Sequence, residues 1–535
     1  MRQLTSQRQN SWLVWFLRGM LLLSIVVLLG RLAELQVIKG AYYRELAEGN
    51  RIRRVPISAP RGSIYARGGE TLVSNGELKK EVVFDPIEGY EKIPATDQTP
   101  VDEVIIEWAR KYDMASITGH ITGYLGEVNE EEVSKVDARC PQNGVLIHGG
   151  MVGRSGLEEE YECLLRGVNG EELVEVDTRG RRVRLLGRKL PISGNDLHTT
   201  IDFKLQKKVA EVMDGKPGAV IITNTKGEIL ALYSSPSYDP NIFVTGEQKQ
   251  VNEILINENL PLFNRVIGGV YHPGSIYKIV TSTAALEEGA IGSDFTYVDT
   301  GVVSVDSYNY TNWYFTEYGG VEGEIDLPRA LSRSTDTFYY KLGEFTGIDA
   351  LVVWSHRFGL GEKTGIDLPG EVNGLVPTPE WKKATKGERW YLGNTYHMAI
   401  GQGDLIITPL QSHRIVSVIA ANGQLCTPFI NAQKEENCAK LSISDTTLQL
   451  IEDGMTRACK PGGTGVPFFD FPINVACKTG TAETVEANVT HAWFVVYAPL
   501  DNPEIIMTVL VEKGGGGSDI AAPIAREVFD YVFNP

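Results

Sequence analysis

Residues 271–280 read Tyr-His-Pro-Gly-Ser-Ile-Tyr-Lys-Ile-Val, and the rest of the chain is organised around them. A Pro-Gly pair breaks the preceding extended run, and the sequence predicts a helix from Ser275 through Leu286 that is closed by Gly289. Ser275 and Lys278 then lie a turn apart on one helix face, beside free N–H groups of the helix N-terminus. The lysine amine can take the serine proton, which a serine hydroxyl must lose to act as a nucleophile. Alone, the pattern is weak evidence, and an ordinary helix start with a solvated lysine is the alternative interpretation.

A second polar stretch, Ser-Arg-Ser-Thr-Asp at residues 332–336, follows later in the chain. Ser334 offers a hydroxyl that can relay a proton, and Asp336 offers an acceptor two residues on. Serine and aspartate are also favoured at helix ends, so a helix cap is the alternative interpretation.

The third stretch, Val-Ala-Cys-Lys-Thr-Gly-Thr at residues 475–481, is predicted to be a strand. Lys478 can hold a substrate carboxylate electrostatically, and Thr479 can hydrogen-bond it. Gly480 would let another chain lie flat against the strand edge. The backbone N–H groups of Thr481 and Ser275 could form an oxyanion hole for a tetrahedral intermediate. The alternative is an exposed strand end with a solvated lysine.

Around these stretches the sequence predicts a compact domain that begins near residue 197. Five strands are divided between the start and the end of this domain, with helices inserted between them, which indicates one antiparallel sheet layered with helices. Two hairpins are expected, one across the Asn-Thr-Lys-Gly turn at 224–227 and one across Asp-Asn-Pro at 501–503. The predicted strands are 219–223, 228–234, 475–480, 492–498 and 504–512, and a helix at 519–532 closes the chain.

The composition is that of a globular protein with two or three domains: 535 residues, 42% hydrophobic and 22% charged. A net charge of -17 without a long basic run argues against a nucleic-acid partner. The six cysteines include no C-x-x-C pair and the eight histidines no H-E-x-x-H, so we expect no metal and no cofactor. Cys426 and Cys438 fit either a bridged loop outside the cytoplasm or two small buried apolar side chains.

The N-terminal segment predicts a membrane anchor. Residues 12–30 are apolar except for Arg18 and are long enough for one crossing. Arg2 and Arg8 in the polar tail, 1–11, place that tail in the cytoplasm and the bulk of the chain outside it. A signal-peptide core is the alternative, but no Ala-x-Ala-like cleavage site follows, so we favour an uncleaved anchor. Residues 31–54 then look like a helical stalk.

Together and in this order, the three stretches resemble the S-x-x-K, S-D-N and K-T-G motif set of penicillin-binding proteins and class A β-lactamases. Residues 61–67, Arg-Gly-Ser-Ile-Tyr-Ala-Arg, are similar to the R-G-x-I-x-D-R segment of class B penicillin-binding proteins, with Ala66 where that pattern has Asp. Residues 153–167 look like the pedestal segment of the same class, opening with a predicted capping box of Ser155 and Glu158. Further segments similar to this class lie at residues 236–241, 365–371 and 401–403.

The resemblance implies an α+β protein with a membrane-anchor helix at 12–30, an elongated dimerisation-type pedestal at 31–195 and a transpeptidase domain at 196–535. That domain would have the penicillin-binding, β-lactamase-like fold, with a five-stranded antiparallel sheet flanked by helices. No glycosyltransferase domain fits into the pedestal, which is about the size of one small domain.

The implied activity is that of a peptidoglycan D,D-transpeptidase that cross-links stem peptides through an acyl-serine and is inhibited covalently by β-lactams. Its implied catalytic residues are Ser275, Lys278, Ser334 and Lys478. Its implied substrate-binding residues are Asp336, Thr479, Gly480 and Thr481.

In the second motif, Asp336 occupies the position where most of the superfamily has Asn. The elongation-type members, which are called penicillin-binding protein 2, commonly have Ser-x-Asp in this motif. We therefore favour a role in cell elongation and shape over one in septal division. A D,D-carboxypeptidase or β-lactamase, a β-lactam sensor and a non-catalytic scaffold are the rivals. His272 stands where the family usually has a second proline, and packing is the favoured interpretation.

The resemblance also implies a partner, a membrane-embedded glycosyltransferase of the shape, elongation, division and sporulation type. The pedestal and the anchor helix would form the contact surface.

Overall fold

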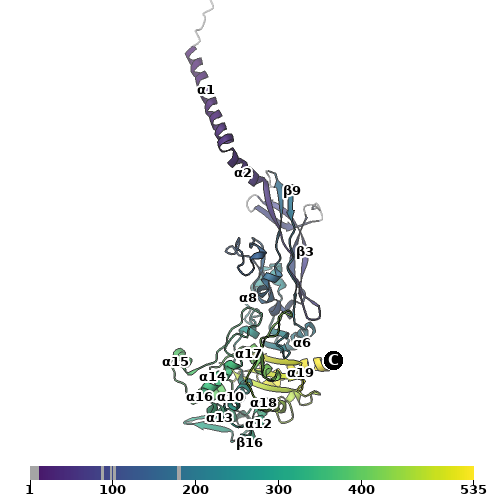
Figure 1. The fold of residues 1–535 in the computed structure, drawn as a ribbon, viewed down its shortest axis with the longest axis vertical. Coiled ribbons are helices and arrows are strands. Elements are labelled where there is room, and N and C mark those ends of the chain that lie inside the picture. Colours follow the sequence, from purple (N-terminus) through teal and green to yellow (C-terminus); the bar gives the residue numbers. More distant parts are fainter. Residues whose placement is uncertain (1–10, 86–88, 97–98, 100–103, 178–181, 535) are drawn as a thin grey trace, which may run out of the picture. The chain divides into compact units, whose positions relative to one another are not determined.

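A computed structural model describes residues 11–85, 89–96, 99, 104–177 and 182–534 (Figure 1). The polar tail at 1–10 and parts of 84–115 lie outside these residues. The chain divides into two compact units, each described by itself below. The N-terminal unit comprises Met1–Ala59, Glu77–Glu107 and Val168–Ile192, and the C-terminal unit comprises Pro60–Gly76, Trp108–Gly167 and Ser193–Pro535. The domain boundary expected at 195/196 stays a prediction.

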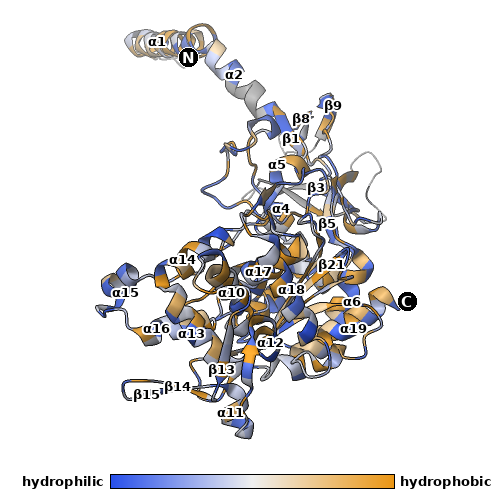
Figure 2. Ribbon diagram, turned by 60° about the horizontal axis from the view of Figure 1, so that its bottom comes forward, coloured by the Kyte–Doolittle hydropathy of each residue, from blue (hydrophilic) through white to orange (hydrophobic). Residues whose placement is uncertain are grey.

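The N-terminal unit begins with α1 (Ser11–Ala33), in which apolar residues, orange in Figure 2, predominate. Among the described residues, Trp12–Ile38 is the one helical stretch that is long and apolar enough to cross a membrane; it has 27 residues, and its most apolar 18-residue window has a mean hydropathy of 2.3. This is consistent with a single-pass anchor at the predicted position. The predicted stalk continues as η1 (Glu34–Ile38) and α2 (Gly40–Arg51), and it ends where β1 (Ile52–Ile57) starts.

The N-terminal unit also holds an antiparallel sheet in the order β1-β8-β9, with β8 (Gly170–Val176) in the centre and β9 (Arg182–Lys189) outside. Side chains of β8 alternate between buried and half-buried, as expected for a strand with one covered face. β4 (Gly89–Pro94) pairs antiparallel with the second half of β3 (Thr71–Asp85), and β5 (Val104–Tyr112) also pairs with β3.

The core of the C-terminal unit is a five-stranded antiparallel sheet, which confirms the predicted fold class. Its order is β12-β11-β21-β20-β19, so the first two and the last three strands of the domain meet between β11 and β21. Both predicted hairpins are present. The strands are β11 (Gly218–Thr223), β12 (Ile229–Ser235), β19 (Ala476–Glu483), β20 (Thr490–Ala498) and β21 (Ile505–Val511).

Helices cover both faces of this sheet (Figure 1). On one face α6 (Phe203–Met213) and α19 (Ala522–Phe533) pack on alternate strand residues such as Val220 and Phe494. On the other face α10 (Lys278–Glu287) and α17 (Pro409–Ala420) share a core with Ile221, Val495 and their neighbours. Strands buried on both faces explain the nearly continuous apolar runs in their sequences.

The remaining elements surround these layers. The helices and single turns are η2 (Ala115–Ile117), α3 (Gly119–Thr122), η3 (Pro141–Asn143), α4 (Gly156–Glu160), α5 (Glu162–Leu165), α7 (Asn241–Thr245), α8 (Gln248–Leu255), α9 (Arg265–Gly268), η4 (Gly274–Tyr277), α11 (Trp313–Tyr318), α12 (Leu327–Arg333), α13 (Asp336–Thr346), α14 (Ile348–Arg357), α15 (Pro379–Lys386), α16 (Leu392–Ala399), α18 (Asp445–Ala458), η5 (Val466–Phe468) and η6 (Gly517–Ala521). The short strands are β2 (Ile64–Tyr65), β6 (Leu125–Glu127), β7 (Met151–Gly153), β10 (Leu197–His198), β13 (Thr296–Asp299), β14 (Val302–Val305), β15 (Tyr308–Thr311), β16 (Gly323–Asp326), β17 (Gln424–Cys426) and β18 (Cys438–Lys440).

A buried charge cluster lies in the C-terminal unit, where the sequence predicts a capping box. Glu158 is fully buried, and its carboxylate accepts hydrogen bonds from Arg61 Nη2 (2.8 Å) and Arg110 Nε (2.6 Å). Arg61 also donates to Glu162 (2.7 Å). The predicted capping box is wrong: Ser155 is the N-cap residue of α4, but its side chain makes no cap bond, and the Glu158 carboxylate binds two guanidinium groups instead. The segment that follows forms two short helices, α4 and α5, which are separated by Tyr161.

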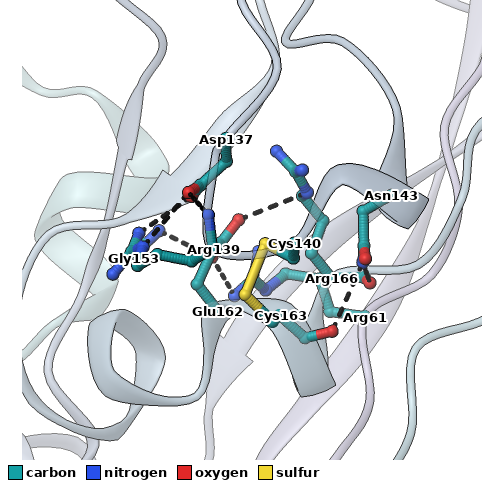
Figure 3. The surroundings of a disulfide bond; sticks show 9 residues. All are labelled: Arg61, Asp137, Arg139, Cys140, Asn143, Gly153, Glu162, Cys163 and Arg166. Carbon is teal, nitrogen blue, oxygen red and sulfur yellow. Dashed lines mark hydrogen bonds and ion pairs between the residues drawn. A yellow bond between two sulfur atoms is a disulfide. The ribbon is translucent and has the colours of Figure 1, made fainter.

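All six cysteines are paired, as Cys140–Cys163, Cys426–Cys438 and Cys459–Cys477. The first cross-link lies beside Arg61, Arg166 and Glu162 (Figure 3). The bridged alternative for Cys426 and Cys438 is therefore the one in the structure, where the bond joins the paired strands β17 and β18.

Candidate functional site

The turn that carries Ser275 is held in place by glycines. Ser275 lies in the single 3-10 turn η4, and the α-helix α10 begins only at Lys278. Gly274 has a positive φ of 54°, and a Cβ there would lie 2.9 Å from the backbone oxygen of Thr481. Its N–H donates to Gly401 O at 2.9 Å, where a Cβ on Gly401 would lie 2.1 Å from Gly274 O. Only glycines at both positions allow the serine turn to lie this close to β19.

The two predicted lysines meet at the predicted relay serine. Lys278 Nζ donates to Ser334 Oγ (3.1 Å) and Ser334 O (2.7 Å), and Lys478 Nζ lies 2.9 Å from the same Ser334 Oγ. Both lysine side chains are completely buried. Three residues that are far apart in the sequence thus share one polar centre, as the motif order predicts.

Ser275 is half-buried, and its hydroxyl forms no hydrogen bond with any residue that the structure describes. The expected contact between Ser275 and the Lys278 amine is therefore not made in this state, because that amine is used by Ser334 and Asp336. The serine oxygen is free to meet an incoming group.

A tight turn between α12 and α13 presents Ser334 and Asp336. Ser334 is the C-cap residue of α12 with a left-handed φ of 57°, which turns the chain sharply before α13 begins at Asp336. Asp336 Oδ1 accepts a hydrogen bond from Lys278 Nζ at 2.7 Å, so in the structure Asp336 forms an ion pair with Lys278. Substrate binding by Asp336 stays a prediction.

Three residues that the sequence analysis did not identify hold this turn. Asn312 Oδ1 accepts from the Asp336 N–H (3.2 Å), and the Trp313 N–H donates to Asp336 Oδ2 (3.2 Å). Asn312 is held in turn by Asp299, a carboxylate that is 1% exposed and also accepts from Thr337 Oγ1 at 2.6 Å. Asn312 and Asp299 have no recognisable sequence motif, and only the fold places them next to Asp336.

β19 is an edge strand, since β20 is its one pairing partner among the strands that the structure describes. Thr479 Oγ1 donates to Thr464 Oγ1 (2.8 Å), and Thr464 also reaches Ser332 O (3.4 Å), so Thr464 links two of the three motifs. The disulfide Cys459–Cys477 joins the end of α18 to this strand directly before Lys478. Binding of another chain along the other edge of β19 stays a prediction.

Gly480 is required by the packing around β19 and not, as predicted, by an incoming chain. A Cβ on Gly480 would lie 2.9 Å from Trp493 Cβ and 3.3 Å from Ile276 Cγ1. The missing side chain therefore makes room for the serine turn and for Trp493, rather than for a chain lying on the strand edge. Nearby, His272 Nδ1 lies 2.7 Å from Leu405 O, which fits the packing role favoured for this histidine.

Burial dominates the electrostatics of the lysine centre. It lowers the pKa of Lys278, and the adjacent Asp336 carboxylate opposes this effect. The pKa of Lys478 is well below its ordinary value, because this lysine is buried and the Lys278 ammonium lies close by. Lys278 has a carboxylate within hydrogen-bond distance to pair with its charge, whereas Lys478 has no such carboxylate among the described residues. Both amines contact one hydroxyl, that of Ser334, which can carry a proton between them.

Comparisons with known proteins agree with this geometry. The chain matches the family model "Penicillin binding protein transpeptidase domain" over residues 218–530 and "Penicillin-binding Protein dimerisation domain" over 88–199. It is 31% identical to the peptidoglycan D,D-transpeptidase MrdA of Acinetobacter baumannii, over 97% of this chain and 87% of that protein. The MrdA of Escherichia coli K12 is also 31% identical, over 97% and 93%.

Solved structures give the same result. Penicillin-binding protein 2 of Helicobacter pylori, in a complex with MreC, matches with a TM-score of 0.78 and 26% identity, over 90% of this chain and 99% of that one. A chain from a structure of a peptidoglycan synthase complex that coordinates polymerization and crosslinking matches with a TM-score of 0.74 and 27% identity, over 97% and 98%. A more distant relative is stage V sporulation protein D of Bacillus subtilis, 27% identical over 95% of this chain and 84% of that protein. The chain therefore belongs to the penicillin-binding proteins with a transpeptidase domain, as a class B member similar to penicillin-binding protein 2.

Proposed function

We propose that this protein is a serine D,D-transpeptidase that cross-links peptidoglycan stem peptides during cell elongation. The observation that carries the proposal is the convergence of Lys278 and Lys478 on Ser334 Oγ, beside the turn that carries Ser275 and at the free edge of β19.

In the first half-reaction, Ser275 Oγ attacks the carbonyl of the penultimate D-alanine and its proton passes to the lysine centre. The scissile C–N bond breaks, and Ser334 relays a proton to the departing D-alanine. The backbone N–H groups of Ser275 and Thr481 stabilise the oxyanion. Lys478 and Thr479 hold the terminal carboxylate, and the substrate chain lies along β19. In the second half-reaction, an amine of another stem peptide resolves the acyl-enzyme.

A fluorescent penicillin tests this assignment, because a β-lactam acylates the same serine. The full-length protein should become labelled on the peptide that contains Ser275, and Ser275→Ala should abolish the label. Labelling that persists in Ser275→Ala would refute the assignment. Steady turnover of nitrocefin without build-up of an acyl-enzyme would favour a hydrolase instead.

The elongation role is supported by the 31% identity to MrdA proteins, compared with 27% to the sporulation protein, and by Asp336 in the second motif. Depletion in the source organism should give rounded cells. Filaments would indicate a role in septal division.

The chain acts as a single-pass membrane protein with a cytoplasmic N-terminus and an extracytoplasmic catalytic domain. Its partner is a membrane-embedded glycosyltransferase of the shape, elongation, division and sporulation type, bound through the pedestal and the anchor helix. The match to a chain of a peptidoglycan synthase complex supports this pairing. Reporter fusions at each terminus test the orientation, and copurification of the glycosyltransferase with the full-length chain, but not with a chain lacking residues 1–59, tests the partner.

A further inference from the structure

A backbone hydrogen bond is missing directly before the serine turn. Tyr271 and Ile407 form an antiparallel bridge, in which each N–H donates to the other carbonyl at 2.9 Å. Continued by two residues, the same register places Leu405 opposite Pro273. A proline has no N–H, so Pro273 cannot donate to the Leu405 carbonyl. Leu405 is completely buried, so its carbonyl needs a donor from within the protein.

The side chain of His272 supplies this donor. His272 Nδ1 lies 2.7 Å from Leu405 O, and this is the one hydrogen bond of that carbonyl in the described part of the chain. A carbonyl oxygen only accepts, so Nδ1 carries a hydrogen. The next residue, Ile406, pairs with Leu375 on the opposite side. The Leu405 carbonyl therefore faces the segment that leads into the serine turn.

The same segment of chain, residues 401–405, also holds the serine turn at its other end. Gly274 N–H donates to Gly401 O at 2.9 Å, and Ser275 follows Gly274 directly. Between this contact and the bridge at Tyr271, three steps along one segment match six along the other. The second segment therefore bulges, and backbone pairing does not fix its course between the two contacts. The imidazole of His272 fixes it at Leu405.

A further contact holds the backbone of the histidine. Trp493 Nε1 donates to His272 O at 3.1 Å, which attaches this residue to β20. Trp493 also lies against the position that a Cβ on Gly480 would take in β19. His272 is thus attached to the sheet through its carbonyl and to residues 401–405 through its ring. Because it lies three residues before Ser275, both contacts affect the position of the nucleophile.

We propose that His272 is a positioning residue for Ser275, and that its hydrogen bond to Leu405 keeps residues 401–405 in the place from which Gly401 holds the serine turn. This inference rests on the proposed function. It goes beyond packing, because it depends on the donor and not on the volume of the ring. The second proline that the family usually has here would restrict φ to about −65° but could not donate.

The test measures acylation of the full-length protein by fluorescent penicillin over a range of concentrations, which separates the acylation rate constant from the dissociation constant of the non-covalent complex. His272→Leu should lower the acylation rate constant about tenfold, because a small displacement of a nucleophile is costly. The dissociation constant should change by less than about twofold, since the groups that bind the penicillin stay in place. His356→Leu, at an exposed position on α14, is the matched control and should leave both constants unchanged.

Two amide variants separate the hydrogen bond from the volume of the side chain. The amide nitrogen of asparagine can take the position of Nδ1, whereas that of glutamine lies nearer the position of Nε2. His272→Asn should therefore restore the acylation rate constant to within about threefold of the wild-type value, because it restores the donor to Leu405. His272→Gln should stay close to His272→Leu.

An acylation rate constant in His272→Leu within about twofold of the wild-type value would overturn the positioning role. Equal losses in His272→Asn and His272→Leu would also overturn it, because the volume of the ring would then matter and not its donor. If His272→Leu does not fold, an equal rate constant in His272→Asn and His272→Gln overturns the role. If the wild-type protein does not take the penicillin at Ser275, the proposed function itself fails.

Discussion

Asp336→Asn removes one negative charge from the lysine centre while keeping the size of the side chain. Asp336 Oδ1 lies 2.7 Å from Lys278 Nζ, and no other described carboxylate forms an ion pair with this lysine. Burial lowers the pKa of Lys278, and Asp336 raises it toward its ordinary value. The asparagine oxygen can still accept the Trp313 N–H that Asp336 Oδ2 accepts at 3.2 Å. The substitution therefore tests charge rather than packing.

The expected shift follows from the value of one charge-assisted hydrogen bond. Such a bond contributes about 1.5–3 kcal/mol, which corresponds to about 1–2 pKa units. Without Asp336, the pKa of Lys278 falls further. The pKa of Lys478, which Asp336 also raises, falls in the same direction. A general base must be neutral to accept a proton, so the acid limb of the pH–rate profile should move to lower pH by about 1–2 units.

The assay is the rate constant for acylation by fluorescent penicillin, measured across the pH range for the wild-type protein and for Asp336→Asn. Asp349→Asn, an exposed aspartate on α14, controls for the change in net charge and should leave the profile in place. An acid limb that stays where it is in Asp336→Asn would refute the reasoning, because neither lysine would then be the group whose deprotonation limits acylation.

Arg61→Met should lower the free energy of unfolding of the C-terminal unit by about 3–5 kcal/mol, because it leaves Glu158 and Glu162 buried without this partner. Urea denaturation measures the loss, and Arg61→Lys should recover part of it. Gly480→Ala should slow acylation by fluorescent penicillin roughly tenfold or more, because the new Cβ meets Trp493 and the serine turn must move. Labelling at the wild-type rate would mean that β19 accommodates the methyl group without displacing the serine turn. Asp299→Ala should lower the free energy of unfolding by at least about 3 kcal/mol in urea denaturation, because several donors lose a buried acceptor. It should also slow acylation by fluorescent penicillin, because Asp336 loses its support. An unchanged acylation rate in fully folded protein would show that Asp299 does not support the site.

The sequence alone was enough to predict the parts of the protein that have a local signature. The apolar runs of the central sheet, the turns at 224–227 and 501–503 and the apolar N-terminal helix can all be seen in short windows. The order of the three motifs was enough to predict that Lys278, Ser334 and Lys478 meet. These residues lie at the ends of elements whose packing the sheet determines, so a correct fold brings them together.

What could not be predicted depends on long-range contacts. The sequence around Glu158 fits a capping box, and nothing local indicates that Arg61 and Arg110 take its carboxylate. Gly480 appeared to serve an incoming chain, but its neighbour Trp493 comes from β20, and only the register of β19 on β20 reveals the contact. Thr464 and Asn312 are ordinary loop residues in the sequence, and they become part of the site only in three dimensions.

The three cystines have a practical consequence for preparing this protein. All six sulfur atoms are consumed, and one of the bonds fastens the strand immediately ahead of Lys478 to the end of α18. A polypeptide produced in a reducing cell compartment would carry free thiols at all these positions. Samples intended for inhibitor screening should therefore be exported or oxidised before use, and their thiol content should be titrated first. Otherwise weak labelling by a β-lactam would reflect unformed disulfide bonds in the sample and not a low affinity of the enzyme.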